Sequence, residues 1–237
     1  MFAGINAIGA NIILLTEASL KIQYVPADVV IRNTGWFCWL DEKWRFEIPD
    51  DSAELLFLPD SHCTCPLPKV LWHPVVYNAY PHLRDVQVEF NNSIPGAGSF
   101  GIGIYSLRIP PLIRIKRYRS EKAILSTILH EVQHAIQAIE RFSPGCGKCA
   151  IKAYEVPASS EKDFYLKCCG EVEARITQAR HALGHEERKH TPINAHQDVP
   201  SSDILVLPCA KRDFFGRDVS SGLTNITTHW RLKDERY

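Results

Sequence analysis

The clearest pattern in the chain is a run of apolar residues with helical spacing between residues 120 and 142. Apolar side chains recur there every three or four positions, as they do on one face of an amphipathic helix. They are Ile124, Leu125, Ile128, Leu129, Val132, Ala135, Ile136 and Ile139. Ser120 is a favoured N-cap residue, and Pro144-Gly145 is typical of a helix end. The pattern therefore predicts one long helix from about Ser120 to Phe142.

A second helical pattern extends over residues 160–183. Its apolar stripe comprises Tyr165, Cys169, Val172, Ile176, Ala179 and Leu183. This period predicts a second long helix, and it assigns Tyr165 to the core rather than to chemistry. From His185 onward the sequence has little periodicity, and no element is predicted there.

The N-terminal part predicts two helices and a hairpin. The apolar run over 2–22 predicts a buried first helix, and a second helix is expected over 26–33, with a proline in its first turn. Residues 36–40 and 43–48 are rich in aromatic side chains and flank a short polar turn. That arrangement is typical of a β-hairpin.

The middle of the chain contains the remaining strands. Residues 49–69 hold four prolines and are expected to form a loop. A short helix is predicted over 74–80, and strands are predicted over 86–90, 99–105 and 112–115. Together these elements indicate the α+β class, with a small mixed β-sheet packed on the two long helices.

The composition argues against two classes of partner. The chain has 237 residues, of which 45% are apolar, so it can bury a sizeable core. Lys and Arg number 27, and Asp and Glu also number 27, so the formal net charge is zero. Without a basic excess, neither nucleic acid nor a membrane surface is favoured as a partner.

The cysteines and the N-terminus indicate a cytoplasmic protein. The eight cysteines include the vicinal pair Cys168-Cys169, which does not resemble a secreted disulfide framework. The apolar N-terminus lacks the positive region of a signal peptide and falls short of the ~20 residues of a membrane span. We expect a cytoplasmic location, in a producing or a recipient cell, without classical secretion.

Candidate chemistry lies in the middle of the helix predicted over 120–142, where the sequence reads His130-Glu131-Val132-Gln133-His134. Two histidines four positions apart lie about 40° apart around a helix axis, so both imidazoles can reach one metal ion. Glu131 could take a proton from water on that metal. The same spacing also occurs in helices whose histidines only belong to a polar stripe.

A catalytic zinc ion needs a third protein ligand and one open position. Glu171 and Glu173 on the second predicted helix are the candidates, and they lie about 200° apart around its axis, so one of them at most faces the metal. Ala174 and Arg175 favour Glu171, because a small residue lets the helices approach and a polar one can brace a ligand. Glu173 is then expected to be a structural ion-pair carboxylate.

Several motifs together closely resemble the zincin-like metallopeptidase domain of large polyvalent proteins of bacteriophages and other mobile elements. The motifs that carry this resemblance are residues 129–137, Tyr165 and residues 170–175, with Met1-Phe2-Ala3-Gly4, Thr34-Gly35-Trp36-Phe37, residues 43–48, His73-Pro74, Ala79-Tyr80-Pro81, residues 83–86, Gly98-Ser99-Phe100 and Gln197-Asp198-Val199-Pro200.

The resemblance implies a domain organisation. It covers about residues 1–205 and implies a single zincin-like domain. Within it, residues 1–70 hold the N-terminal helices and hairpin, and residues 71–205 form the metal-binding core. Residues 206–237 form a tail of unknown role.

The resemblance also implies a site and an activity. His130, His134 and Glu171 would hold one Zn²⁺ ion, and Glu131 would be the general base of a zinc metalloendopeptidase. The substrate would be a protein or peptide, lying along an edge strand such as the one predicted over 99–105. The rival hypothesis is a catalytically silent zincin module that binds a host or phage protein.

The sequence leaves several further alternatives open. Cys63, Cys65, Cys146 and Cys149 could hold a second, structural zinc ion. One of His181, His185, His190 and His196 could polarise a scissile carbonyl, although solvated surface histidines are the simpler interpretation. The substrate's identity and the oligomeric state do not follow from the sequence.

Overall fold

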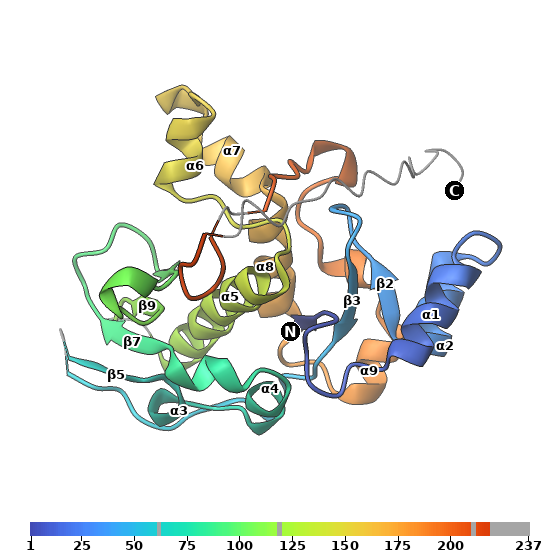
Figure 1. The fold of residues 1–237 in the computed structure, drawn as a ribbon, viewed down its shortest axis with the longest axis horizontal. Helices are drawn as coiled ribbons and strands as arrows, with labels where there is room; N and C mark the ends of the chain where they lie inside the picture. Colours follow the sequence, from blue (N-terminus) through green and yellow to red (C-terminus); the bar gives the residue numbers. More distant parts are fainter. Residues whose placement is uncertain (61–62, 118–119, 210–211, 219–237) are drawn as a thin grey trace.

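The computed structural model describes residues 1–60, 63–117, 120–209 and 212–218, with all their side chains except those of Tyr105, Cys149 and His185. Within these residues the chain has a mixed α+β architecture with small sheets (Figure 1). None of the helices in this part of the chain combines the length and the apolar character that a membrane crossing requires.

Helix α5 (Glu121–Glu140) runs through the middle of the molecule and confirms the main predicted helix (Figure 1). The side chain of Ser120 caps it by accepting a hydrogen bond from the backbone of Ala123. The helix ends at Arg141, which has a left-handed backbone conformation. One side of α5 faces a sheet, and the opposite side packs against α8 (Cys169–Arg180).

The sheet on α5 has four strands in the order β5-β7-β9-β8. Strands β7 (Gln87–Phe90) and β9 (Leu112–Ile115) are parallel, whereas β5 (Thr64–Pro66) and β8 (Gly98–Gly101) are antiparallel to their neighbours. Apolar side chains of β7, β9 and α5 form the main core, among them Val88, Phe90, Ile113, Ile115, Ile128 and Val132. This packing brings the edge strand β8 against α5.

A second sheet belongs to the N-terminal part and confirms the predicted hairpin. Strands β2 (Trp36–Cys38) and β3 (Trp44–Glu47) are antiparallel, and β1 (Phe2–Ala3) pairs with the other side of β3. Helices α1 (Ile12–Lys21) and α2 (Ala27–Thr34) lie beside this sheet (Figure 1). The segment before α5 also contains β4 (Glu54–Leu55), α3 (Leu67–Val70), β6 (Leu71–Trp72) and α4 (Pro74–Ala79).

Two predictions for the first 70 residues were wrong. The helix expected over 2–22 begins only at Ile12, because residues 2–3 pair as β1 and Asn11 caps the later start. That helix is also not buried, since Ala18 is its one buried residue. The loop expected over 49–69 instead contains β4, β5 and α3.

The second long helix expected over 160–183 was also wrong as a single element. The structure has α7 (Glu161–Lys167) and α8, separated at Cys168, whose backbone is extended. Leu205 stabilises this break, because its backbone accepts from Cys169 and donates to Lys167. Helix α6 (Lys148–Ala153) precedes α7, and the short helix α9 (His185–His190) follows α8.

The segment after residue 205, expected as a tail of unknown role, enters buried clusters where the structure describes it. Leu207 packs with Cys146 and Cys168. Phe214 is 2% exposed, belongs to the main core and stacks on Phe100 of β8. Residues 219–237 lie outside the described part of the chain.

Candidate metal centre

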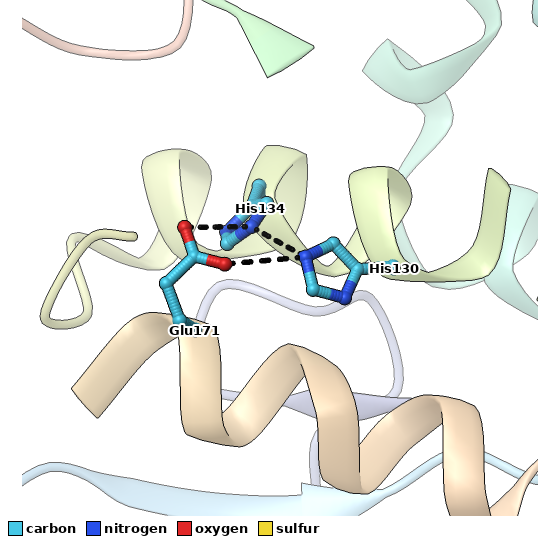
Figure 2. A group of neighbouring side chains, drawn as sticks. All are labelled: His130, His134 and Glu171. Carbon is cyan, nitrogen blue, oxygen red and sulfur yellow. Dashed lines mark hydrogen bonds and ion pairs between the residues drawn. The ribbon is translucent and has the colours of Figure 1, made fainter. Parts of the chain in front are cut away.

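Helix α5 directs two imidazoles toward α8 from successive turns. His130 and His134 are four positions apart, and their Nε2 atoms lie 3.1 Å from each other (Figure 2). Both rings are largely shielded from solvent. The spacing in the sequence therefore produces the expected convergence of two nitrogen donors.

Helix α8 supplies the third group, Glu171, in its first turn. The carboxylate Oε2 lies 3.3 Å from Nε2 of His130, and Oε1 lies 3.5 Å from Nε2 of His134 (Figure 2). Gly170 lets the loop at Pro144 and Gly145 pack closely on the start of α8, because any side chain there would collide with the backbone of that loop. These three residues form the one His/Cys/Asp/Glu group that could hold a metal ion within the described residues.

The donor set fits a tetrahedral cation such as zinc. Bonds of about 2.0–2.2 Å at tetrahedral angles separate neighbouring ligand atoms by about 3.3–3.6 Å. The two Nε2 atoms lie 3.1 Å apart, and they lie 3.3 and 3.5 Å from the two different oxygens of the Glu171 carboxylate, so the groups converge within reach of one ion. Oε2 of Glu171 is also buried without a hydrogen-bond partner, a state that costs free energy unless a cation compensates it.

Charge in the centre favours an ionised carboxylate. Burial alone would raise the pKa of Glu171, but His134 and His130 outweigh it and hold that pKa well below its usual range. The backbone N–H of Cys146 also donates to Oε1 of Glu171, at 3.0 Å. The third ligand is therefore available as an anion, which is the form that binds a metal.

Two glutamines contact the outer nitrogens of the histidines, and the sequence analysis missed both roles. Nδ1 of His134 lies 2.8 Å from Oε1 of Gln137, and Nδ1 of His130 lies 2.9 Å from Oε1 of Gln178. An amide oxygen at Nδ1 favours the tautomer with hydrogen there, which leaves Nε2 for a metal. Gln178 lies two helical turns after Glu171 and therefore on the same face of α8. This spacing is the signal in the sequence that could have identified Gln178.

Glu131 lies beside this group under the edge strand. Glu131 is buried, with 5% of the residue exposed. The backbone N–H of Phe100 donates to its carboxylate. Burial raises the pKa of Glu131, and the two histidines oppose the shift. A Cβ atom on Gly98 would lie 2.6 Å from Oε1 of Glu131, so the close approach of β8 depends on that glycine.

Tyr165 does not belong to the core, contrary to the prediction. Its side chain is 37% exposed, and it extends from α7 to the carboxylate of Glu171. Burial and the charges of Glu171 and Glu131 raise the pKa of its phenol, so the hydroxyl keeps its proton. The apolar stripe placed Tyr165 in the core because the sequence pattern assumed one unbroken helix over 160–183.

The alternative ligand Glu173 points away from the group. Its Oε2 atom lies 2.6 Å from Nε of Arg45, in a buried ion pair. Arg175 was expected to brace Glu171, and this is wrong, because its guanidinium pairs with Asp198. Ala174 is fully buried, as a residue at a close helix contact would be.

The other cysteines and histidines do not join a metal group in the part of the chain that the structure describes. Cys65 lies in β5 and packs against the main core, whereas Cys146 clusters with Cys168 near α6. The side chains of Cys149 and His185 lie outside the described residues. His181 contacts the backbone of Gln178 through Nδ1.

Comparison with known proteins links the N-terminal segment to one group of proteins. Residues 1–56 match the family model of the large polyvalent protein associated domain 23, which links the chain to large polyvalent proteins. The matched segment contains the N-terminal sheet and ends before the residues of the metal centre. Searches of curated proteins and of solved structures gave no match.

Proposed function

We propose that this chain is a zinc-dependent metallopeptidase of the zincin type, in which His130, His134 and Glu171 hold the ion. The observation that carries the proposal is the convergence of two Nε2 atoms and one carboxylate, whose ligand atoms lie within 4.8 Å of one another. The motifs that resemble zincin-like domains of large polyvalent proteins, and the match of residues 1–56 to a domain of such proteins, point to the same group of proteins. Zinc with three protein ligands would supply Lewis-acid chemistry, making water more acidic and polarising a carbonyl.

Glu131 is the general base of the proposed reaction. It accepts a proton from the attacking water and then passes that proton to the leaving amine. Two features of its surroundings suit this task. Burial raises its pKa toward the working range of a base, and the N–H of Phe100 holds one side of the carboxylate in place.

Backbone pairing and one hydroxyl would position the substrate. An extended peptide along the edge of β8 would pair with its backbone and pass Glu131. Tyr165 is partly exposed and lies beside Glu171. Its neutral hydroxyl can donate a hydrogen bond to the carbonyl oxygen that gains charge during attack.

The test compares wild type with Glu131→Gln on a pool of peptides, and mass spectrometry identifies new chain ends. We expect both proteins to bind one zinc ion per chain, and cleavage by the variant to fall by at least about 10²-fold. Equal cleavage by the two proteins would refute Glu131 as the base. Zinc bound to both with no cleavage by either would support the rival, a silent module that binds a host or phage protein.

A further inference from the structure

Glu173 lies at the centre of a buried polar network that connects the metal centre to the N-terminal hairpin. The network consists of Asp41 and Arg45 from the hairpin, Gln133 and Gln137 from α5, and Glu173 from α8. Arg45, Gln133, Gln137 and Glu173 are each at most 2% exposed. Water therefore does not compete for these hydrogen bonds, and the partners inside the network determine how each side chain is oriented.

The side-chain amide of Gln137 can be oriented in one way only. Its Nε2 atom lies 2.9 Å from the backbone oxygen of Gly170 and 3.1 Å from Oε1 of Glu173. Both partners are acceptors, so a flipped amide would set its oxygen against two other oxygens. The amide oxygen must then face Nδ1 of His134, at 2.8 Å, and Nδ1 must be the donor.

Glu173 is itself held from three directions. Nε of Arg45 donates to Oε2 at 2.6 Å, and Nε2 of Gln133 donates to Oε1 at 2.7 Å, the oxygen that Gln137 also contacts. Asp41 holds the far side of the Arg45 guanidinium at 2.7 and 2.9 Å. Arg45, Gln133 and Gln137 all donate to Glu173, so its carboxylate is the acceptor in each of these contacts.

We propose that Glu173 is a positioning residue of the metal centre, which fixes the amide of Gln137 so that His134 presents Nε2 to the metal. Arg45 makes this function depend on β3, within the segment that matches the polyvalent-protein family model. The inference rests on the proposed function, in which His134 is a ligand. His130 is braced differently, since Gln178 takes its orientation from Ser126 on α5.

The test uses two matched variants of the full chain, Gln137→Met and Gln133→Met. Both replace a buried glutamine of α5 and remove one hydrogen bond to Glu173, but only Gln137 contacts a histidine ligand. We expect Gln137→Met to weaken the zinc Kd by about 10- to 100-fold. Gln133→Met should lower stability while its zinc Kd stays close to that of wild type. A folded Gln137→Met protein with the wild-type Kd would overturn the proposal, as would equal losses in both variants.

A second variant tests Glu173 itself, and a second measurement does not require zinc. Glu173→Gln keeps the shape of the side chain but puts an amide donor among donors, so the orientation of Gln137 is no longer fixed. Its zinc Kd should weaken, and an unchanged Kd would overturn the proposal.

In zinc-free protein, NMR should detect a protected proton on Nδ1 of His134 in wild type and Gln133→Met and lose it in Gln137→Met. Its presence in all three would contradict the proposal even if the wild type bound no zinc and the proposed function failed.

Discussion

Gly145 is the residue at which a single added methyl group would disturb the metal centre most directly. A Cβ atom there would lie 2.5 Å from both Oε1 of Glu171 and Cε1 of His134. We expect Gly145→Ala to displace a ligand and weaken the zinc Kd by about tenfold or more. Gly147→Ala is the matched control, because a Cβ atom at that position meets nothing within 4 Å. Zinc titration of both proteins checks this, and equal Kd values would show that the loop does not border the site.

His134 is the ligand whose proton competes with the metal. Burial alone would lower its pKa, but Glu171 and Glu131 outweigh burial and raise the pKa to about 9. Below that pH a cation must displace a proton, so the zinc Kd should weaken by about tenfold for each pH unit that the pH falls. Chelator-competition titrations between about pH 6 and pH 8 check this slope. A Kd that does not change over this interval would contradict the raised pKa.

The raised pKa of His134 changes the stability of the zinc-free protein in the opposite direction to its zinc affinity. The ordinary pKa of the ring is 6.5, so the raised value stabilises the folded protein fully below that pH. This contribution is lost as the pH rises through about 9. Stability of the metal-free chain and its affinity for zinc should therefore change in opposite directions with pH.

The sequence predicted those residues of the site that lie on one helix. His130, Glu131 and His134 follow from spacing alone, because a single turn brings them together. The choice of Glu171 over Glu173 needed neighbouring residues or a family resemblance, since both flank the same stripe. Gln137 and Gln178 were missed because their role depends on which nitrogen of each ring faces the neighbouring helix, which spacing does not reveal.

At the scale of elements, prediction worked where apolar periodicity was long and unbroken. Helix α5 and the hairpin of β2 and β3 were predicted correctly. The prediction of a buried helix over 2–22 failed because Ile5, Ile8 and Ile13 are apolar but exposed, so their apolar character did not indicate burial. The break at Cys168 was not predicted, because it is stabilised by Leu205, which lies far along the chain.

That break determines where Tyr165 points, and it leads to a prediction about α7. One continuous helix would carry Tyr165 on the buried stripe, whereas the turn at Cys168 brings it to Glu171. If its hydroxyl donates to the developing oxyanion, Tyr165→Phe should lower kcat by about 10²-fold and leave the zinc Kd unchanged. Peptide-cleavage kinetics alongside zinc titration separate the two effects. A variant with wild-type kcat would remove Tyr165 from the reaction.

At the scale of the whole molecule, both ends of the described chain contribute to the framework of the metal centre. The backbone of Phe2 exchanges hydrogen bonds with Gln133 of α5, and Glu47 pairs with Arg180 of α8. The family-matched segment 1–56 therefore packs directly on the two helices that carry the candidate ligands. Periodicity could not predict these contacts, because they join residues more than 130 positions apart.

Phe214 makes a comparable contact from the C-terminal end of the described residues. It is buried in the main core and stacks on Phe100 of the edge strand. Phe214→Ala should lower the free energy of unfolding by about 3–5 kcal/mol, because it leaves a cavity in a packed core. Phe57→Ala, at a 57% exposed position, is the control and should change it by about 0.5 kcal/mol or less. Urea denaturation measures both, and similar small losses would show that the segment after residue 205 adds nothing to the core.

An anomalous diffraction map, recorded at the zinc edge from crystals of the full chain grown with zinc, locates the metal ion itself. We predict one strong peak between α5 and α8, about 2.0–2.2 Å from Nε2 of His130, Nε2 of His134 and an oxygen of Glu171. A map with no peak at this position, or with zinc bound only at the cysteines, would rule out a zinc site at these three residues.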